Sequence, residues 1–157
     1  MGRAVLCTES ANSMRIMGID YGDSRIGVSV SDPMGWIAQA VETINLNGST
    51  SKALQRIYEL AQGYSAGRIV VGFPKNMNGT IGPRGEKTLE FIELLDRKIN
   101  NEENGIEIIK WDERLTTVAA NRTMHELGVK TSRKKKLVDQ IAAVYILQGY
   151  LDSLKNL

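Results

Sequence analysis

The spacing at which apolar residues recur along the chain changes near residue 49, from a strand-like to a helix-like period. This change restricts the fold more than any other feature of the sequence. Before it, Arg15–Asp20 and Ile26–Ser31 are typical of two strands joined by a tight turn, and Trp36–Ile44 contains a third. After it, segments of helical period alternate with short apolar runs. Three consecutive strands followed by helix-to-strand crossings predict one mixed sheet.

The elements predicted after the change are, in order, a helix from Ser49 or Thr50 to Gly63, a buried strand over Gly67–Phe73, a loop over 73–83, a helix from about Gly85, a strand over Ile106–Trp111, a helix over Leu115–Leu127, a basic loop over Gly128–Lys134 and a final helix over Lys136–Leu154. The inner face of the final helix is predicted to carry Leu137, Ile141, Val144, Tyr145, Gln148 and Leu151. The order predicts an α/β fold: a five-stranded sheet, antiparallel in its first three strands and parallel afterwards, with helices on both faces.

The length of 157 residues suits one domain. We assign residues 14–157 to that domain, and we predict that residues 1–13 form a flexible extension. Lys and Arg number 20 against 18 Asp and Glu, so net charge alone does not indicate a nucleic-acid binder. The single cysteine excludes an intrachain disulfide and fits the cytoplasm. No apolar run approaches the roughly 20 residues that span a membrane.

Three acids stand where strands end or helices begin. Asp20 closes the first strand, Glu113 follows the fifth, and Asp139 lies near the start of the final helix. If the first and fifth strands are neighbours and the final helix crosses their ends, the three carboxylates converge, and their repulsion requires a cation. Oxygen ligands without sulfur or imidazole suit Mg²⁺ or Mn²⁺, and two such ions can promote phosphodiester hydrolysis.

Each acid also has a structural interpretation. Asp20 could be a turn residue with roughly even odds, and Glu113 could cap a helix. For Asp139 we favour function by roughly two to one, because an acid among the apolar residues of an amphipathic helix is uncommon unless it is paired or binds a metal.

Two basic regions are candidates for nucleic-acid binding. The loop after the fourth strand offers backbone donors with Lys75, Asn76, Asn78 and Arg84, and the run Arg133, Lys134, Lys135 and Lys136 precedes Asp139. Either region could instead be an ordinary solvated surface. Aromatic residues are sparse in both, so base stacking there is a weak expectation.

Four ordered blocks resemble the YqgF/RuvX family, whose members are often named Holliday junction resolvases or pre-16S rRNA nucleases. The blocks are GIDYG with RIGV at 18–28, GFPKNMNG at 72–79, DERLTT at 112–117, and Asp139 with AA at 142–143 and ILQGYL at 146–151. The likeness runs from about Met14 to Leu154. Two departures are Asn78, where family members commonly carry aspartate, and Gly72-Phe73-Pro74, where the related RuvC-type resolvases carry a catalytic glutamate.

The resemblance implies an RNase H-like nuclease domain with Asp20, Glu113 and Asp139 as its acidic triad, Mg²⁺ or Mn²⁺ as cofactor and structured nucleic acid as substrate. It also places Arg114, beside Glu113, in the nucleic-acid-binding set. The leading hypothesis is a metal-dependent endonuclease that processes the 5′ end of precursor 16S ribosomal RNA. The alternatives are resolution of Holliday junctions, where symmetric cutting would require a homodimer, and a non-catalytic nucleic-acid-binding regulator.

Overall fold

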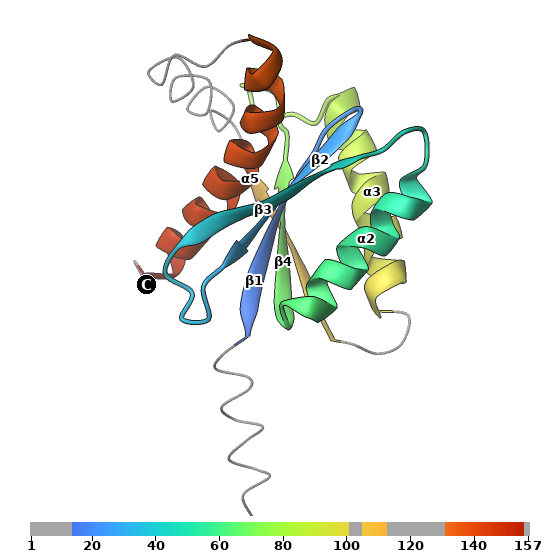
Figure 1. Ribbon diagram of the computed structural model, residues 1–157. Coiled ribbons are helices and arrows are strands. Elements are labelled where there is room, and N and C mark those ends of the chain that lie inside the picture. The colour runs from blue at the N-terminus through green and yellow to red at the C-terminus, as the bar shows by residue number, and fades with distance from the viewer. Residues whose placement is uncertain (1–13, 101–104, 113–130, 156–157) are drawn as a thin grey trace, which may run out of the picture.

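A computed structural model describes residues 14–100, 105–112 and 131–155. Its five strands form one sheet in the order β3-β2-β1-β4-β5 (Figure 1). The strands are β1 (Arg15–Tyr21), β2 (Arg25–Ser31), β3 (Ala38–Asn45), β4 (Ala66–Phe73) and β5 (Glu107–Asp112). β1, β2 and β3 pair antiparallel, and β1, β4 and β5 pair parallel. The predicted mixed sheet is confirmed, with strand ends that differ by one or two residues.

Helices cover both faces of this sheet, as predicted. Figure 1 shows α2 (Thr50–Gly63) and α3 (Pro83–Asn100) on one side and α5 (Thr131–Lys155) on the other. Ser49 caps α2, because its side chain accepts a hydrogen bond from the Lys52 amide. Pro83 begins α3, where a missing amide hydrogen costs nothing. None of the helices over the described residues is both long and apolar enough to cross a membrane.

The alternation of side chains along β1 divides the interior into two cores. Met17 and Ile19 belong to the larger core, which lies beneath α2 and α3. Ile16 belongs to the smaller core, with Ile146 and Leu147 of α5. Because successive residues of a strand point to opposite faces, Gly18 and Asp20 share the α5 face with Ile16. The acid at the end of β1 therefore belongs to the side that α5 covers.

The start of α5 differs from the prediction. The helix begins at Thr131, so Thr131–Lys134 is helical where a loop was predicted, and the basic run 133–136 occupies its first turns. Lysine and arginine are good helix formers, and Thr131 and Ser132 suit a helix start, so the charge run was a poor indicator of a loop. The predicted helix over 115–127 and the predicted extension over 1–13 lie outside the described residues.

The predicted inner face of α5 was partly right. Leu151 is buried, Val144 packs against the smaller core, and Gln148 accepts from the Ala38 amide and donates to the Trp36 carbonyl oxygen. Tyr145 was wrongly placed, because it is 37% exposed. The buried residues are Ala142, Ala143, Ile146, Leu147, Tyr150 and Leu151. Apolar residues occur around most of the circumference of this helix, so periodicity alone could not select the stripe. The face of α5 that packs on the sheet is the one that contains the small residues Ala142 and Ala143, because they allow close contact.

Candidate active site

α5 approaches the sheet closely at Gly18. A Cβ atom there would lie 2.5 Å from Ser29 Oγ, 2.7 Å from Leu147 Cβ and 3.0 Å from the Ala143 carbonyl oxygen. Ser29 Oγ donates a 2.8 Å hydrogen bond to that same carbonyl oxygen. A glycine on β1 and a buried hydroxyl on β2 thus fix the position of α5. Sequence analysis missed both residues, although their place on the α5 face follows from the alternation of the strands.

Asp20 lies one step beyond this contact, toward the carboxyl end of β1. It is half-buried, and its neighbour across the antiparallel pair is Gly27. On the other side, Ile19 pairs with Val71, so continuation of the parallel register sets Gly72 beside Asp20. The residues beside Asp20 on β2 and β4 are therefore both glycines, which carry no side chain.

The backbone position of Asp139 is level with Asp20. The end of α5 packs at the start of β1, where Leu151 and Ile16 share a core, so helix and strand run in opposite directions. From Gly18 to Asp20 the strand advances about 6.6 Å. From Ala143 back to Asp139 the helix advances about 6 Å in the same direction. Measured along β1 from the Gly18 contact, the two positions therefore lie at about the same height.

The third predicted acid, Glu113, and its neighbour Arg114 lie outside the described residues. Asp112 ends β5 and pairs with Phe73, so β5 ends at the same edge of the sheet as β1 and β4. Among the described residues, no three histidine, cysteine, aspartate or glutamate side chains form a group that could hold a metal. The side chains of Glu113 and Asp139 are not among the described ones.

The loop between β4 and α3 is held in shape by hydrogen bonds of its asparagine side chains. The Asn76 side chain donates to Thr80 Oγ1 at 2.9 Å, and Asn78 Oδ1 accepts from the Thr80 amide at 3.1 Å and from its hydroxyl at 2.6 Å. Lys75 is exposed beside them. Asn76 and Asn78, predicted to contact nucleic acid, thus hold the loop in shape.

Arg84 joins the first turn of α3 to the β1–β2 hairpin. Its guanidinium donates to Asp23 Oδ1 at 2.6 Å and to the Tyr21 carbonyl oxygen, and it lies 5.0 Å from the centroid of the Tyr21 ring. Tyr21 in turn stacks on Phe91 of α3 at 4.2 Å. The side chain that was predicted to grip a phosphate backbone is engaged with the residue next to Asp20.

Arg84→Ala is expected to lower the free energy of unfolding by about 1–2 kcal/mol, because it removes a charged hydrogen-bond donor from two acceptors. Arg84→Lys should recover only part of this, because lysine cannot reproduce the planar fork. Thermal or urea unfolding without any nucleic acid measures the effect. Lys87→Ala, which removes an exposed cation one turn along α3, is the matched control. Unchanged stability in Arg84→Ala would contradict the tethering role.

The sequence profile of the RuvX family, described as "Holliday junction resolvase", matches residues 14–153. The chain belongs to the RuvX family. The match covers every described strand and most of α5, so the site at the end of β1 lies within the shared region.

RuvX relatives are similar to this chain over nearly their whole length. A protein of Acetivibrio thermocellus is 64% identical over 140 residues, which cover 89% of this chain and 96% of the relative. A protein of Ruminiclostridium cellulolyticum is 57% identical over 141 residues, which cover 90% and 96%. Both are named "Putative pre-16S rRNA nuclease".

Among solved structures, RuvC of Thermus thermophilus resembles this RuvX chain with a TM-score of 0.54 and 15% identity, over 91% of this chain and 97% of RuvC. The same protein in complex with a Holliday junction substrate gives a TM-score of 0.53 and 16% identity, over 90% and 96%. At this identity the likeness concerns the fold alone, and it confirms the RNase H-like architecture that the resemblance implied.

Proposed function

We propose that this protein is a divalent-metal-dependent endonuclease that processes the 5′ end of precursor 16S ribosomal RNA in the cytoplasm. The observation that carries the proposal is the position of Asp20, at the carboxyl end of a central strand and beside Gly27 of β2. Membership of the RuvX family and the name shared by its relatives support a nuclease.

The proposed metal ligands are Asp20, Glu113 and Asp139. The chemistry of this donor set fits Mg²⁺ or Mn²⁺, because all three groups are hard oxygen donors. When bound, a divalent ion supplies Lewis-acid activation of water and charge neutralisation at the scissile phosphate.

The protein's own contribution at this edge is to hold Asp20 in place. β2 and β4 pair with β1 on either side, and Arg84 fixes the hairpin that follows. A carboxylate on a central strand of a packed sheet loses little conformational freedom when it binds a metal ion. This favours a well-defined catalytic geometry.

Substrate phosphates would meet positive charge from two directions. The exposed Lys75 belongs to the loop that Asn76 and Asn78 shape. Arg133, Lys134, Lys135 and Lys136 occupy the first turns of α5, where the helix dipole is already positive. Four cations at a helix N-terminus are unfavourable for the helix alone and favourable for an anionic ligand. We therefore propose that these residues, with Arg114, hold the nucleic-acid backbone near Asp20.

Resolution of branched DNA is the second candidate, favoured by the description of the family profile. Symmetric cutting of a junction would need two copies of the site, and hence a homodimer. The residues around Gly72 argue against carrying the RuvC mechanism over unchanged, because glycine, phenylalanine and proline stand where RuvC-type resolvases carry a catalytic glutamate.

The test compares two substrates with purified protein and Mg²⁺ or Mn²⁺. We expect cleavage of a precursor RNA mimic that contains the 5′ leader, and much slower cleavage of a four-way DNA junction. Preferential symmetric cutting of the junction would reverse the order of the two candidates. Absence of cleavage on both substrates would contradict the proposed hydrolysis.

A further inference from the structure

The loop between β2 and β3 exposes large apolar side chains at the end of the sheet opposite Asp20. Met34 is 75% exposed, Trp36 53% and Ile37 65%. Single exposed apolar residues are common, but three within four positions of one loop form a patch of the kind that meets a ligand or partner.

This loop is held in one conformation. Asp32 Oδ1 accepts hydrogen bonds from the amides of Trp36 at 2.7 Å and Ile37 at 2.9 Å, and the Asp32 amide donates to the Ile37 carbonyl oxygen at 3.0 Å. The Ile37 amide is the main cause that lowers the pKa of Asp32. Gly35 adopts a φ of +74°, which glycine tolerates best. The exposed indole is therefore presented by a preorganised turn, which lowers the entropic cost of binding.

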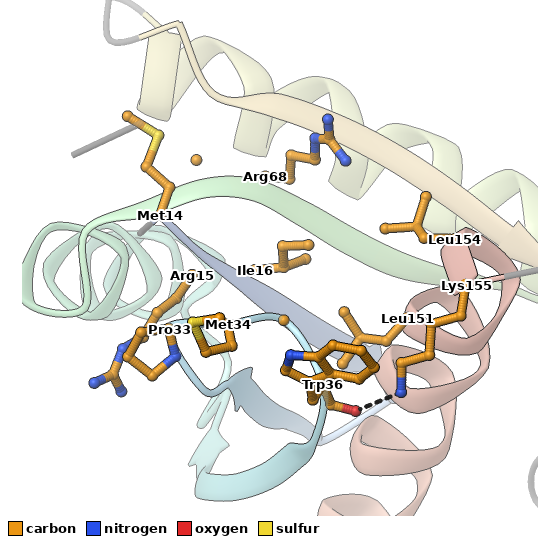
Figure 2. A pocket seen from close by; sticks show the side chains of 12 residues that line it. Met14, Arg15, Ile16, Pro33, Met34, Trp36, Arg68, Leu151, Leu154 and Lys155 are labelled. Carbon is orange, nitrogen blue, oxygen red and sulfur yellow. Dashed lines mark hydrogen bonds between the residues drawn. The ribbon is translucent and has the colours of Figure 1, made fainter. Parts of the chain in front are cut away.

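Trp36 forms one wall of an open pocket of about 480 Å³, a size suited to a small ligand (Figure 2). Ile16 and Leu151 lie between Trp36 on one side and Arg68 on the other. Lys155 Nζ lies 4.9 Å from the indole centroid and donates to the Trp36 carbonyl oxygen at 3.0 Å, a bond drawn in the figure. The pocket thus combines an apolar floor with an exposed aromatic surface.

The charge of the lining is positive. Arg68 and Lys155 contribute to it, whereas the guanidinium of Arg15, which also lines the pocket, lies 5.5 Å from the centroid of the Tyr64 ring. None of the twelve described residues that line the pocket is acidic. Two carboxylates, Glu107 and Asp152, contact Arg68 and Lys155 at 3.5 Å from outside the lining. A ligand in the pocket would therefore meet cations directly and carboxylates only behind them, which favours an anion with a flat apolar part.

We propose that this pocket binds one nucleotide of a single-stranded flank of the substrate, with its base stacked on Trp36 and its phosphate near Lys155. The proposal rests on the nuclease function above. Aromatic stacking combined with cations is the usual means of binding single strands. Ile16 in the pocket and Asp20 are four strand residues apart, about 13 Å. At the stacked spacing of about 3.4 Å per nucleotide, a flank of two nucleotides spans about 7 Å and falls short of this distance, and a flank of eight spans about 27 Å and exceeds it.

Fluorescence anisotropy tests this with two labelled RNA hairpins, carrying single-stranded flanks of eight or two nucleotides, in EDTA so that nothing is cut. Wild-type protein should bind the longer flank at least about fivefold more tightly, the lower end of what one stacked base contributes. Trp36→Ala should abolish this preference, and Trp36→Phe should retain most of it. Ile37→Ala is the matched control, because Ile37 is even more exposed than Trp36 in the same loop but does not line the pocket.

Three results would overturn the proposal. The first is an equal flank preference in Trp36→Ala and wild type, and the second is an equal loss of the flank preference in Trp36→Ala and Ile37→Ala. The third is dissociation of a dimer by Trp36→Ala with the flank preference intact, which would make the patch an interface between copies. Cleavage with Mn²⁺ is measured separately. A flank preference in a protein that cuts nothing would contradict the proposed hydrolysis and support the pocket.

Discussion

Asp20→Asn is expected to lower metal-dependent cleavage at least about a hundredfold, the scale on which loss of one group that stabilises transition-state charge lowers kcat. The substitution keeps the size of the side chain and removes the charge that would hold a cation. Nucleic-acid binding in EDTA should change little, because the proposed backbone contacts come from other residues. Single-turnover cleavage of the precursor RNA mimic and anisotropy measure the two quantities.

Asp23→Asn provides the matched control. Asp23 lies three residues further along the same hairpin, its side chain is 80% exposed, and an asparagine there can still accept from Arg84. It should therefore cleave at nearly the wild-type rate. Normal cleavage by Asp20→Asn would exclude the metal mechanism, and a protein that binds but never cuts would favour the non-catalytic regulator.

The sheet could be predicted because its signals are local. The apolar run of β4 is bounded by glycines, and Ser49 stands directly before the first helical period, so their limits were found within one or two residues. The candidate acid Asp20 was found for a similar reason, because a carboxylate that directly follows a buried strand contradicts the surrounding pattern.

The position of α5 on the sheet could not be predicted, because it depends on contacts between segments far apart in sequence. Ala143 and Ser29 are 114 residues apart, and only the folded chain brings the hydroxyl to the carbonyl oxygen. The role of Arg84 was hidden in the same way: its partners Tyr21 and Asp23 lie more than 60 residues earlier. Composition identified a cation near the site but could not indicate that the cation binds the hairpin.

Gly18→Ala is expected to affect both stability and catalysis, because Gly18 is the contact from which the relative position of Asp20 and Asp139 follows. The added Cβ would lie 2.5 Å from Ser29 Oγ and 2.7 Å from Leu147 Cβ, far below normal contact distances. Overpacking of this kind should lower the free energy of unfolding by about 2–3 kcal/mol. Denaturant unfolding measures this, and the thermal midpoint should fall by roughly 4–12 °C.

The effect on catalysis should exceed the loss of folded protein. If α5 moves away from β1 to admit the methyl group, position 139 moves relative to Asp20, and a displacement of about 1 Å in a catalytic site can cost on the order of a hundredfold in rate. Gly63→Ala is the control, because nothing lies within 4 Å of a Cβ atom at that position in α2. It should leave cleavage unchanged and raise stability by about 0.4–1 kcal/mol. Wild-type stability and cleavage in Gly18→Ala would mean that α5 does not set the geometry of this site.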